Sequence, residues 1–316
     1  MIKNKPTKAN KIQVAIIVGL ILLLAFLVWS DLPEVFKFFR NFKLVYIVPV
    51  LLLSLANYFI RFLKWQLYLK SLFIKINRKE SLAIFFSGLA FAITPAKMGE
   101  VYKSYLLKVK FNIPISKTAP IVIIDRLTDF ISFIFLGGLG VFIFRYGVLF
   151  FISLSIFLAL LLFILSSKKF SFLFLNKLSK FRFFRNFLPY LENVWNSTIT
   201  MTDPKIILIS IFLGLFAWSA ECLAFWVVLQ GINITNISVF SAFFIYAFSM
   251  ILGAISMIPG GLGIQESSMA GLLILMSLNK TQSTAATLIV RAGTLWFAVL
   301  VGIFALIITQ RSLKKP

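Results

Sequence analysis

Long apolar segments alternate along this chain with short clusters of basic residues. A helix needs roughly 17 to 25 mostly apolar residues to cross the hydrocarbon core of a bilayer. Six segments reach that length: 12–29, 44–63, 118–144, 148–166, 206–229 and 281–308. The pattern therefore predicts an all-α polytopic membrane protein with about six full spans.

Four further apolar pieces are too short or interrupted, namely 81–94, 96–110, 238–258 and 260–278. Pro95 separates the first two, and Pro259-Gly260-Gly261 separates the last two without a polar loop. The 14 residues of 81–94 are too few for a span, so we expect a re-entrant or broken helix hairpin there. The second pair is long enough to span twice, but by analogy with the first we expect a second hairpin.

The two interrupted regions share a pattern: a proline, a glycine four residues later, a glutamate soon after, and an arginine one long segment further on. The copies are Pro95, Gly99, Glu100 and Arg126, and Pro259, Gly263, Glu266 and Arg291. Their proline-to-arginine intervals are 31 and 32 residues. Helix breakers and charges at membrane depth, occurring twice in the same order, predict internal repeats at 44–146 and 206–309 with a transport site between them.

Composition excludes a soluble protein. With 60% hydrophobic residues and a mean hydropathy of +0.98, the chain is too apolar for a soluble globule, so residues 1–316 are predicted to form a single integral membrane domain. The net charge of +22 does not indicate a nucleic-acid partner, because the bases flank apolar segments, where they face anionic lipid headgroups. One cysteine, Cys222, and no histidine allow no intramolecular disulfide and no imidazole ligand or proton relay, and we expect no metal or other cofactor.

Charges in the loops predict the topology. Counted from a cytosolic amino terminus, the cytosolic segments hold 23 Lys and Arg residues and the opposite side holds 5. This bias predicts a multi-pass protein of the cell membrane with both termini in the cytoplasm. The two hairpins then enter from opposite faces, which makes the repeats inverted. No small-x-small cleavage site follows segment 12–29, which we interpret as a retained signal-anchor helix.

Residues 147–205 connect the two predicted repeats. The span at 148–166 inverts the second repeat relative to the first. The basic, Phe-rich stretch from 168 to about 200 is predicted to lie along the cytosolic interface as an amphipathic connector. A small cytosolic helical hairpin is the alternative for this stretch.

Several ionisable residues fall inside the apolar segments and hairpins. They are five of the ten acids (Glu100, Asp125, Asp129, Glu221 and Glu266) and four of the thirty-two bases (Arg61, Lys97, Arg126 and Arg291). An unpaired charge at the bilayer centre costs roughly 2.5 to 3.5 kcal/mol, so these groups must pair or face water. Their number predicts an internal polar cavity.

Each of these charges also has a purely structural interpretation. Arg126 and Asp129 are three residues apart on one helix, and a buried ion pair between them would fix helix packing. Glu100 lies three residues from both Lys97 and Lys103, so a local salt bridge explains it as well as transport does. Both alternatives remain open from the sequence.

The end of the second span carries Arg61, Lys64 and Trp65. We interpret Lys64 and Trp65 as an interfacial anchor, with the lysine reaching to the headgroups, whereas Arg61 lies deeper and can join the cavity. Glu221 has no base on its own helical turn. Its partner is therefore expected on another segment, as Arg61 or Arg291.

The two prolines have a simple alternative, because proline kinks are common in membrane helices. Two kinks in register favour broken helices instead, whose free N–H groups point into a cavity and can hold a phosphate. Gly99 follows the first break, and Gly260, Gly261 and Gly263 would let a headgroup approach the backbone closely at the second. The second turn is not a nucleotide loop, since no Lys-Ser or Lys-Thr follows it.

Three motifs carry a resemblance to a known family. They are Thr94-Pro95-Ala96-Lys97-Met98-Gly99-Glu100, Asp125-Arg126-Leu127-Thr128-Asp129, and Pro259-Gly260-Gly261-Leu262-Gly263-Ile264-Gln265-Glu266 followed by Arg291. The chain resembles, over nearly its whole length, the flippase-like membrane domain of lysylphosphatidylglycerol synthases and its stand-alone relatives. The resemblance implies movement of aminoacylated phospholipid, or of polyprenyl-linked glycolipid, between leaflets. The sequence ends at Pro316 soon after its last span, so the resemblance implies the translocating half and not the lysyltransferase.

Three functions are compatible with these observations. In a lipid translocase, Arg126, Arg291, Lys97 and the half-helix N-termini would hold the phosphate of a membrane lipid, and the acids would balance the cavity or bind a cationic headgroup. An enzyme acting on lipid-linked sugars and a non-catalytic assembly protein are the alternatives. The expected partners are membrane lipids and, as an open possibility, further copies of the chain.

Overall fold

The computed structural model describes residues 32–94, 99–141, 147–170 and 187–313, together with the isolated positions 21, 24 and 28. Within these residues the regular structure is helical and contains no strand. The predicted signal anchor lies outside the described residues except at the three isolated positions. Pro95, Lys97 and residues 171–186 of the predicted connector lie outside them as well.

Four helices are long and apolar enough to cross a membrane: Leu44–Ser71, Gly147–Ser166, Pro204–Gly231 and Lys280–Gln310. The first consists of η1 (Leu44–Tyr46) and α3 (Ile47–Ser71), the second is α8 (Gly147–Ser166) and the third is α11 (Pro204–Gly231). The fourth consists of α14 (Lys280–Arg291), the π-helical turn η6 (Ala292–Trp296) and α15 (Phe297–Leu313). The prediction of an all-α polytopic membrane protein is confirmed.

The predicted span at 118–144 corresponds to α7 (Pro120–Gly138), which has 19 residues. Proline at its start fits the helix because the first turn needs no donor from that position. The short helix α6 (Ile115–Thr118) directly precedes it. The helix carries the three charges of the Asp125–Asp129 motif, and Asp125 and Asp129 are buried. Membrane burial of such charges requires partners from neighbouring helices.

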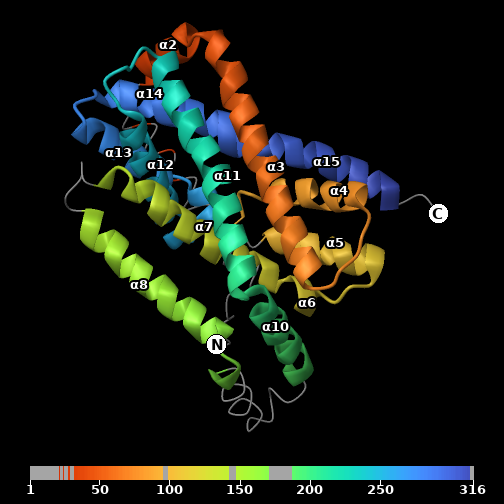
Figure 1. Cartoon of the computed structure of the whole chain (residues 1–316). Coiled ribbons are helices and arrows are strands. Elements are labelled where there is room, and N and C mark those ends of the chain that lie inside the picture. Colours follow the sequence, from red (N-terminus) through yellow and green to blue (C-terminus); the bar gives the residue numbers. More distant parts are fainter. Residues whose placement is uncertain are drawn as a thin grey trace, which may run out of the picture.

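The centre of the fold is an antiparallel pair of long helices, α3 and α11, which lie side by side (Figure 1). The backbone N–H of Lys43, just before α3, donates to the carbonyl of Gly231 at the end of α11, 3.4 Å away. About halfway along both helices, the Asn57 amide donates to the Ala217 carbonyl at 2.8 Å. Both contacts fit one antiparallel alignment of α3 with α11, so the two helices stay together between them.

Both interrupted regions form broken hairpins. The first contains α4 (Arg78–Leu89), turns up to Thr94, and α5 (Tyr102–Phe111). The second contains α12 (Val239–Ile255), the short η5 (Pro259–Gly261) and α13 (Ile264–Leu275). The 12 residues of α13 rise about 18 Å, which is less than the roughly 30 Å hydrocarbon core.

The hairpins pack reciprocally against the ends of the opposite predicted repeats. α4 lies along α15, where the hydroxyls of Ser87 and Thr309 are 3.0 Å apart. α12 lies along α7. Each hairpin therefore uses its first helix to contact the last helix of the other predicted repeat, and the interior is built from both halves of the chain.

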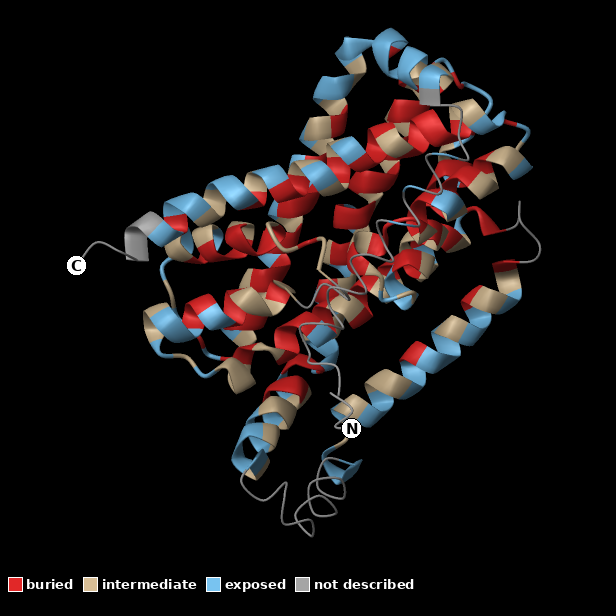
Figure 2. Ribbon diagram, turned by 180° about the vertical axis from the view of Figure 1, so that it is seen from behind, coloured by how far each residue is buried: buried red, intermediate tan, exposed pale blue. Residues whose placement is uncertain are grey.

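Peripheral helices surround this interior. Buried residues concentrate in the middle of the molecule, whereas α8 lies along one side and is mostly exposed (Figure 2). Part of the predicted connector forms α10 (Leu188–Met201), which packs on α6 and α7. An additional helix that the span pattern did not predict, α2 (Leu32–Asn41), packs on α14.

Candidate functional site

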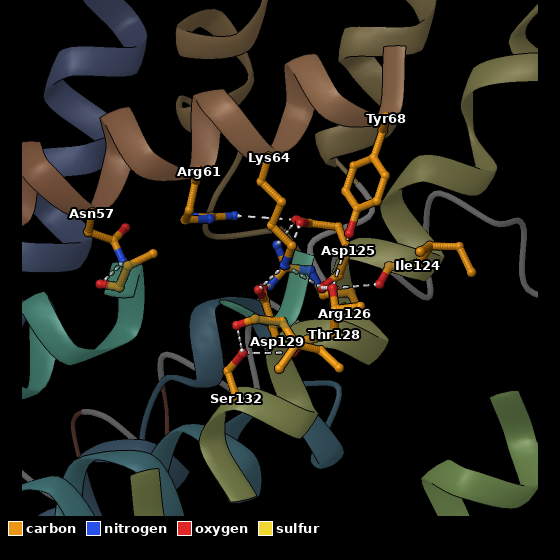
Figure 3. A network of polar contacts seen from close by, with 12 residues as sticks. Asn57, Arg61, Lys64, Tyr68, Ile124, Asp125, Arg126, Thr128, Asp129 and Ser132 are labelled. Carbon is orange, nitrogen blue, oxygen red and sulfur yellow. Dashed lines mark hydrogen bonds and ion pairs between the residues drawn. The ribbon is translucent and has the colours of Figure 1, made fainter. Parts of the chain in front are cut away.

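Seven charged side chains from α3, α7 and the start of α5 form one buried cluster, here called the first charge cluster. Its members are Arg61, Lys64, Glu100, Lys103, Asp125, Arg126 and Asp129. Arg61 and Lys64 point from α3 towards the charged residues of α7 (Figure 3). The cluster exists because the i, i+3 and i, i+4 spacings of each helix put its charges on the face turned to the other helix.

Lys64 is the most deeply buried of these side chains, with 0% of its surface exposed. Its ammonium lies 3.0 Å from Asp125 Oδ1 and 2.7 Å from Asp129 Oδ1. The interpretation of Lys64 as an interfacial anchor is therefore wrong, and the buried Trp65 beside it is no anchor either. Because α3 continues to Ser71, Lys64 sits two turns inside the helix and not at its end.

Glu100 connects three elements. It accepts from the Arg126 guanidinium at 2.7 Å, from the Arg61 guanidinium at 3.3 Å and from the Lys103 ammonium at 3.1 Å. The local salt bridge to Lys103 is therefore present, together with ion pairs to α3 and α7. Lys97, the other predicted neighbour, lies outside the described residues.

Arg126 is the member of the cluster with the most exposed side chain, at 18%. Its guanidinium also lies 3.5 Å from Asp125 and 3.3 Å from Asp129, so the ion pair expected within α7 is present. Its Nε is buried without a hydrogen-bond partner. Arg126 therefore keeps donor capacity while its charge is already balanced.

Arg291 and Glu266 form a second buried pair at the other broken hairpin, with Arg291 Nε 2.6 Å from Glu266 Oε1. The guanidinium also donates to Gln265 Oε1 at 2.7 Å and to the Gly260 carbonyl at 2.6 Å. The opposite oxygen of Glu266 accepts from the Gly263 N–H at 2.7 Å, which caps α13. Arg291 thus fixes the shape of the turn by holding both of its sides.

The turn itself uses glycine where the backbone requires it. Gly260, Gly261 and Gly263 have φ values of 62°, 67° and 82°, a region that side-chain-bearing residues rarely adopt. The Gly261 N–H donates to the Ile258 carbonyl and the Leu262 N–H to that of Pro259. These N–H groups, with that of Gly263, are satisfied within the turn in this conformation, contrary to the expectation that they point freely into a cavity.

Two adjoining cavities lie between the halves of the chain. The inner cavity has a volume of about 220 Å³ and is lined by Thr94, Arg126, Asp129, Phe130, Phe133, Met250, Gly253, Ala254, Met257, Ile258, Gly260, Gly261 and Gln265. The bridging cavity, of about 50 Å³, is lined by Tyr58, Arg61, Leu89, Ala92, Glu100, Trp218, Glu221, Tyr246, Met250, Gly260, Gln265, Arg291, Thr294, Leu295 and Ala298. They share Met250, Gly260 and Gln265. One continuous region of the interior therefore contacts members of the first charge cluster as well as Arg291.

Most of the predicted site residues meet at these two cavities. Arg61, Glu100, Glu221 and Arg291 line the bridging cavity, and Arg126 and Asp129 line the inner one. Asp125 and Glu266 line neither cavity and instead hold Lys64 and Arg291 in place. Gly99 lies outside both linings, where its N–H donates to the Thr94 hydroxyl at 2.7 Å and closes the first turn.

Glu221 receives a hydrogen bond of 2.6 Å from the Tyr246 hydroxyl on α12. Arg61 and Arg291, its predicted partners, line the same bridging cavity. Arg61 is held in place from its other side by Trp218, whose ring centre is 5.4 Å from the guanidinium carbon, a cation–π distance.

Sequence reasoning did not assign Lys64, Lys103, Gln265 or Tyr246 to the site, although it named Lys103 as a candidate local partner of Glu100. The two lysines sit where apolar segments end, a position that is typical of a loop charge. Gln265 was recognisable only as the neighbour of Glu266 in the second motif. Tyr246 lies in a continuous apolar segment and has no distinguishing signal. Among the described residues, no group of three or more Cys, Asp or Glu side chains is arranged to hold a metal ion.

This fold and site define a class: a polytopic helical membrane protein with paired buried charges around a cavity between its two halves. Residues 14–302 match the family described as "Lysylphosphatidylglycerol synthase TM region", and the chain belongs to this family. The resemblance found from the three motifs is therefore confirmed.

Two relatives come from Methanocaldococcus jannaschii. UPF0104 membrane protein MJ1595 is 22% identical over an alignment that covers 100% of this chain and 99% of the relative. UPF0104 membrane protein MJ1078 is 27% identical, covering 71% of this chain and 96% of the relative. The similarity to the first relative extends over the whole length of both chains.

Proposed function

We propose that this protein moves a phosphate-bearing membrane lipid between the two leaflets of the cell membrane. The observation that carries the proposal is the convergence of Arg126 and Arg291, one from each predicted repeat, on two adjoining cavities. Arginine is well suited to a phosphodiester, because its planar fork of donors matches the geometry of phosphate oxygens. A site shared by both halves of the chain can face either leaflet when the halves rock against each other.

The inner cavity suits a headgroup and not a whole lipid. Its volume of about 220 Å³ lies below the roughly 300 to 1,000 Å³ of pockets that enclose drug-sized ligands. Its lining combines the polar side chains of Arg126, Asp129 and Gln265 with apolar ones such as Phe133 and Met257. A phosphate and its polar substituent would bind there while the hydrocarbon chains remain in the bilayer.

The buried pairs make such binding reversible. Arg126 is neutralised by Glu100 and two aspartates when no lipid is present, so no uncompensated charge is buried in the empty state. An entering phosphate replaces Glu100 as an Arg126 partner, and Glu100 keeps Arg61 and Lys103. Exchange of one partner for another costs less than creating a new buried charge.

The proposal is tested in proteoliposomes with a fluorescent phospholipid and an impermeant quencher added outside. Wild-type protein should make the label in the inner leaflet accessible faster than protein-free liposomes do. Arg126→Gln removes the charge that faces the inner cavity and should slow exchange strongly. Arg126→Lys, which keeps the charge and loses the planar fork, should be intermediate.

Lys70→Gln is the matched control, because it removes an exposed cation at the end of the same helix that carries Arg61. It should exchange lipid like the wild type. Exchange by the wild type at the rate of protein-free liposomes, with phosphatidylglycerol, phosphatidylethanolamine and polyprenyl-phosphate lipids alike, would refute the proposed function.

A further inference from the structure

The π-helical turn η6 joins helices α14 and α15 directly after Arg291. π-Helical turns shift the backbone pairing of a helix, leave carbonyls available to other donors and occur often at functional sites. Two such carbonyls accept from hydroxyls of α3: Gly293 from Ser54 at 2.7 Å and Thr294 from Tyr58 at 2.6 Å. We call these two hydrogen bonds, with the packing of Val50 on Gly293, the α3–η6 contact.

This contact separates two cavities of opposite character. Tyr58 and Thr294 line the bridging cavity, together with Arg61 and Arg291. On the other side, Val50 and Gly293 line a third cavity of about 300 Å³, the apolar cavity, whose other lining residues include Phe39, Leu51, Ile289 and Phe297. All of its lining residues are apolar or glycine.

The apolar cavity has the surroundings of a lipid chain. It lies at the first turns of α3. Two exposed bases are chain neighbours of its lining residues: Arg40 follows Phe39, and Lys43 precedes Leu44. A hydrocarbon chain in the cavity would therefore have basic side chains at its polar end, which complements a negatively charged phosphate. In the apolar core of a membrane protein, hydrocarbon is the available ligand that fills such a cavity without unpaired polar groups.

We propose that the apolar cavity binds a hydrocarbon chain of the transported lipid, and that the α3–η6 contact opens to let the headgroup of the same lipid pass into the bridging cavity. This inference rests on the proposed function and assigns its lateral entrance. Opening breaks the two hydroxyl–carbonyl hydrogen bonds of the contact. The freed carbonyls and hydroxyls can then bond to the passing headgroup.

The first test fills the apolar cavity. Leu51→Trp adds volume inside it, whereas Leu52→Trp makes the same change one residue further along, at a side chain that is 60% exposed on the outside of α3. In the liposome assay, and with both variants monodisperse and helical, Leu51→Trp should slow exchange several-fold and Leu52→Trp should not. Equal rates for the two variants would overturn the assignment of the cavity.

The second test locks the contact. A Cβ built on Gly293 lies 4.0 Å from the Cβ of Val50, within the roughly 3.5 to 4.5 Å of a disulfide, and Val50→Cys removes the γ-carbon that approaches it at 2.6 Å. In a Cys222→Ser background, Val50→Cys with Gly293→Cys should lose exchange on oxidation and regain it on reduction. Each single cysteine variant should be insensitive to oxidant.

The outcomes separate this inference from the function on which it rests. A wild type that exchanges lipid while the oxidised double variant exchanges equally fast overturns the entrance and leaves the translocase intact. A wild type without exchange overturns both. Loss of exchange on oxidation, restored by reductant, supports the entrance.

Discussion

Lys64 shows how a single residue holds this interior together. Its side chain is fully buried and joins α3 to two carboxylates of α7. Burying an ammonium costs several kcal/mol unless partners surround it, and here Asp125 and Asp129 supply them. The same carboxylates also contact Arg126, so Lys64 and Arg126 share them as partners.

We expect Lys64→Met to lower the free energy of unfolding by about 3 to 5 kcal/mol, because it leaves two buried carboxylates with one partner fewer. Adding Asp129→Asn to that variant should recover part of the loss, since the amide carries no charge. The stability of both variants is measured by heating the protein in detergent and monitoring the loss of the monodisperse peak. A double variant that is no more stable than Lys64→Met would show that Lys64 and Asp129 are not energetically coupled.

Which charges sequence reasoning could find depended on their surroundings. Arg126 and Arg291 interrupt apolar segments, so their cost in the bilayer identified them directly. Lys64 and Lys103 stand next to polar or basic stretches, where a surface position is the usual interpretation. Only the length of α3 and the packing of α5 against α4 reveal their burial.

At the scale of elements, α15 and the end of α4 approach each other very closely at a glycine. A Cβ built on Gly302 would lie 2.0 Å from the backbone nitrogen of Ala90. Backbone atoms cannot move aside as a side chain can, so the two helices meet at this distance only with glycine. This approach holds the first hairpin against the last helix of the other predicted repeat.

Gly302→Ala should therefore lower the free energy of unfolding by about 1 to 3 kcal/mol, the usual cost of overpacking a tight interior. Gly138→Ala is the control, because nothing lies within 4 Å of a Cβ built there. It should leave the melting temperature unchanged or raise it slightly. Equal melting temperatures for Gly302→Ala and the wild type would contradict the close approach of α4 and α15.

Segment length and helix breakers were good predictors of the elements. Within the described residues, the long spans lie close to their predicted ranges, the second hairpin breaks at Pro259, and the first contains turns up to Thr94. The π-helical turn η6 was not predictable, because Ala292 to Trp296 have no breaker beyond Gly293 and the turn is stabilised by hydroxyls of the distant α3. Helix α2 was missed because its alternation of Phe and charged residues is too short and polar for a span.

For the whole molecule, the antiparallel α3–α11 pair and the reciprocal hairpin contacts are compatible with inverted repeats, and the inversion itself stays a prediction. The first long helices of the two predicted repeats, α3 and α11, are antiparallel to each other, as expected for two copies of opposite orientation. The burial of Lys64 and Lys103 reduces the predicted cytosolic count of bases from 23 to 21 against 5. The bias of the loop charges therefore survives the correction, and with it the predicted sidedness.

The sidedness has a direct test in a Cys222→Ser background, where single cysteines are placed at exposed lysines. Lys43→Cys at the start of the first long helix and Lys280→Cys at the start of α14 should react with an impermeant thiol reagent added to intact cells. Lys75→Cys and Lys108→Cys, which lie beyond the other end of α3 and near the end of α5, should react only after permeabilisation.

The expectation follows because α3 crosses the bilayer between positions 43 and 75, and α14 begins after the second hairpin has returned to its own side. Labelling of Lys280→Cys only after permeabilisation, with Lys43→Cys still accessible, would show that the second hairpin does not return, and the two halves would then not be inverted copies.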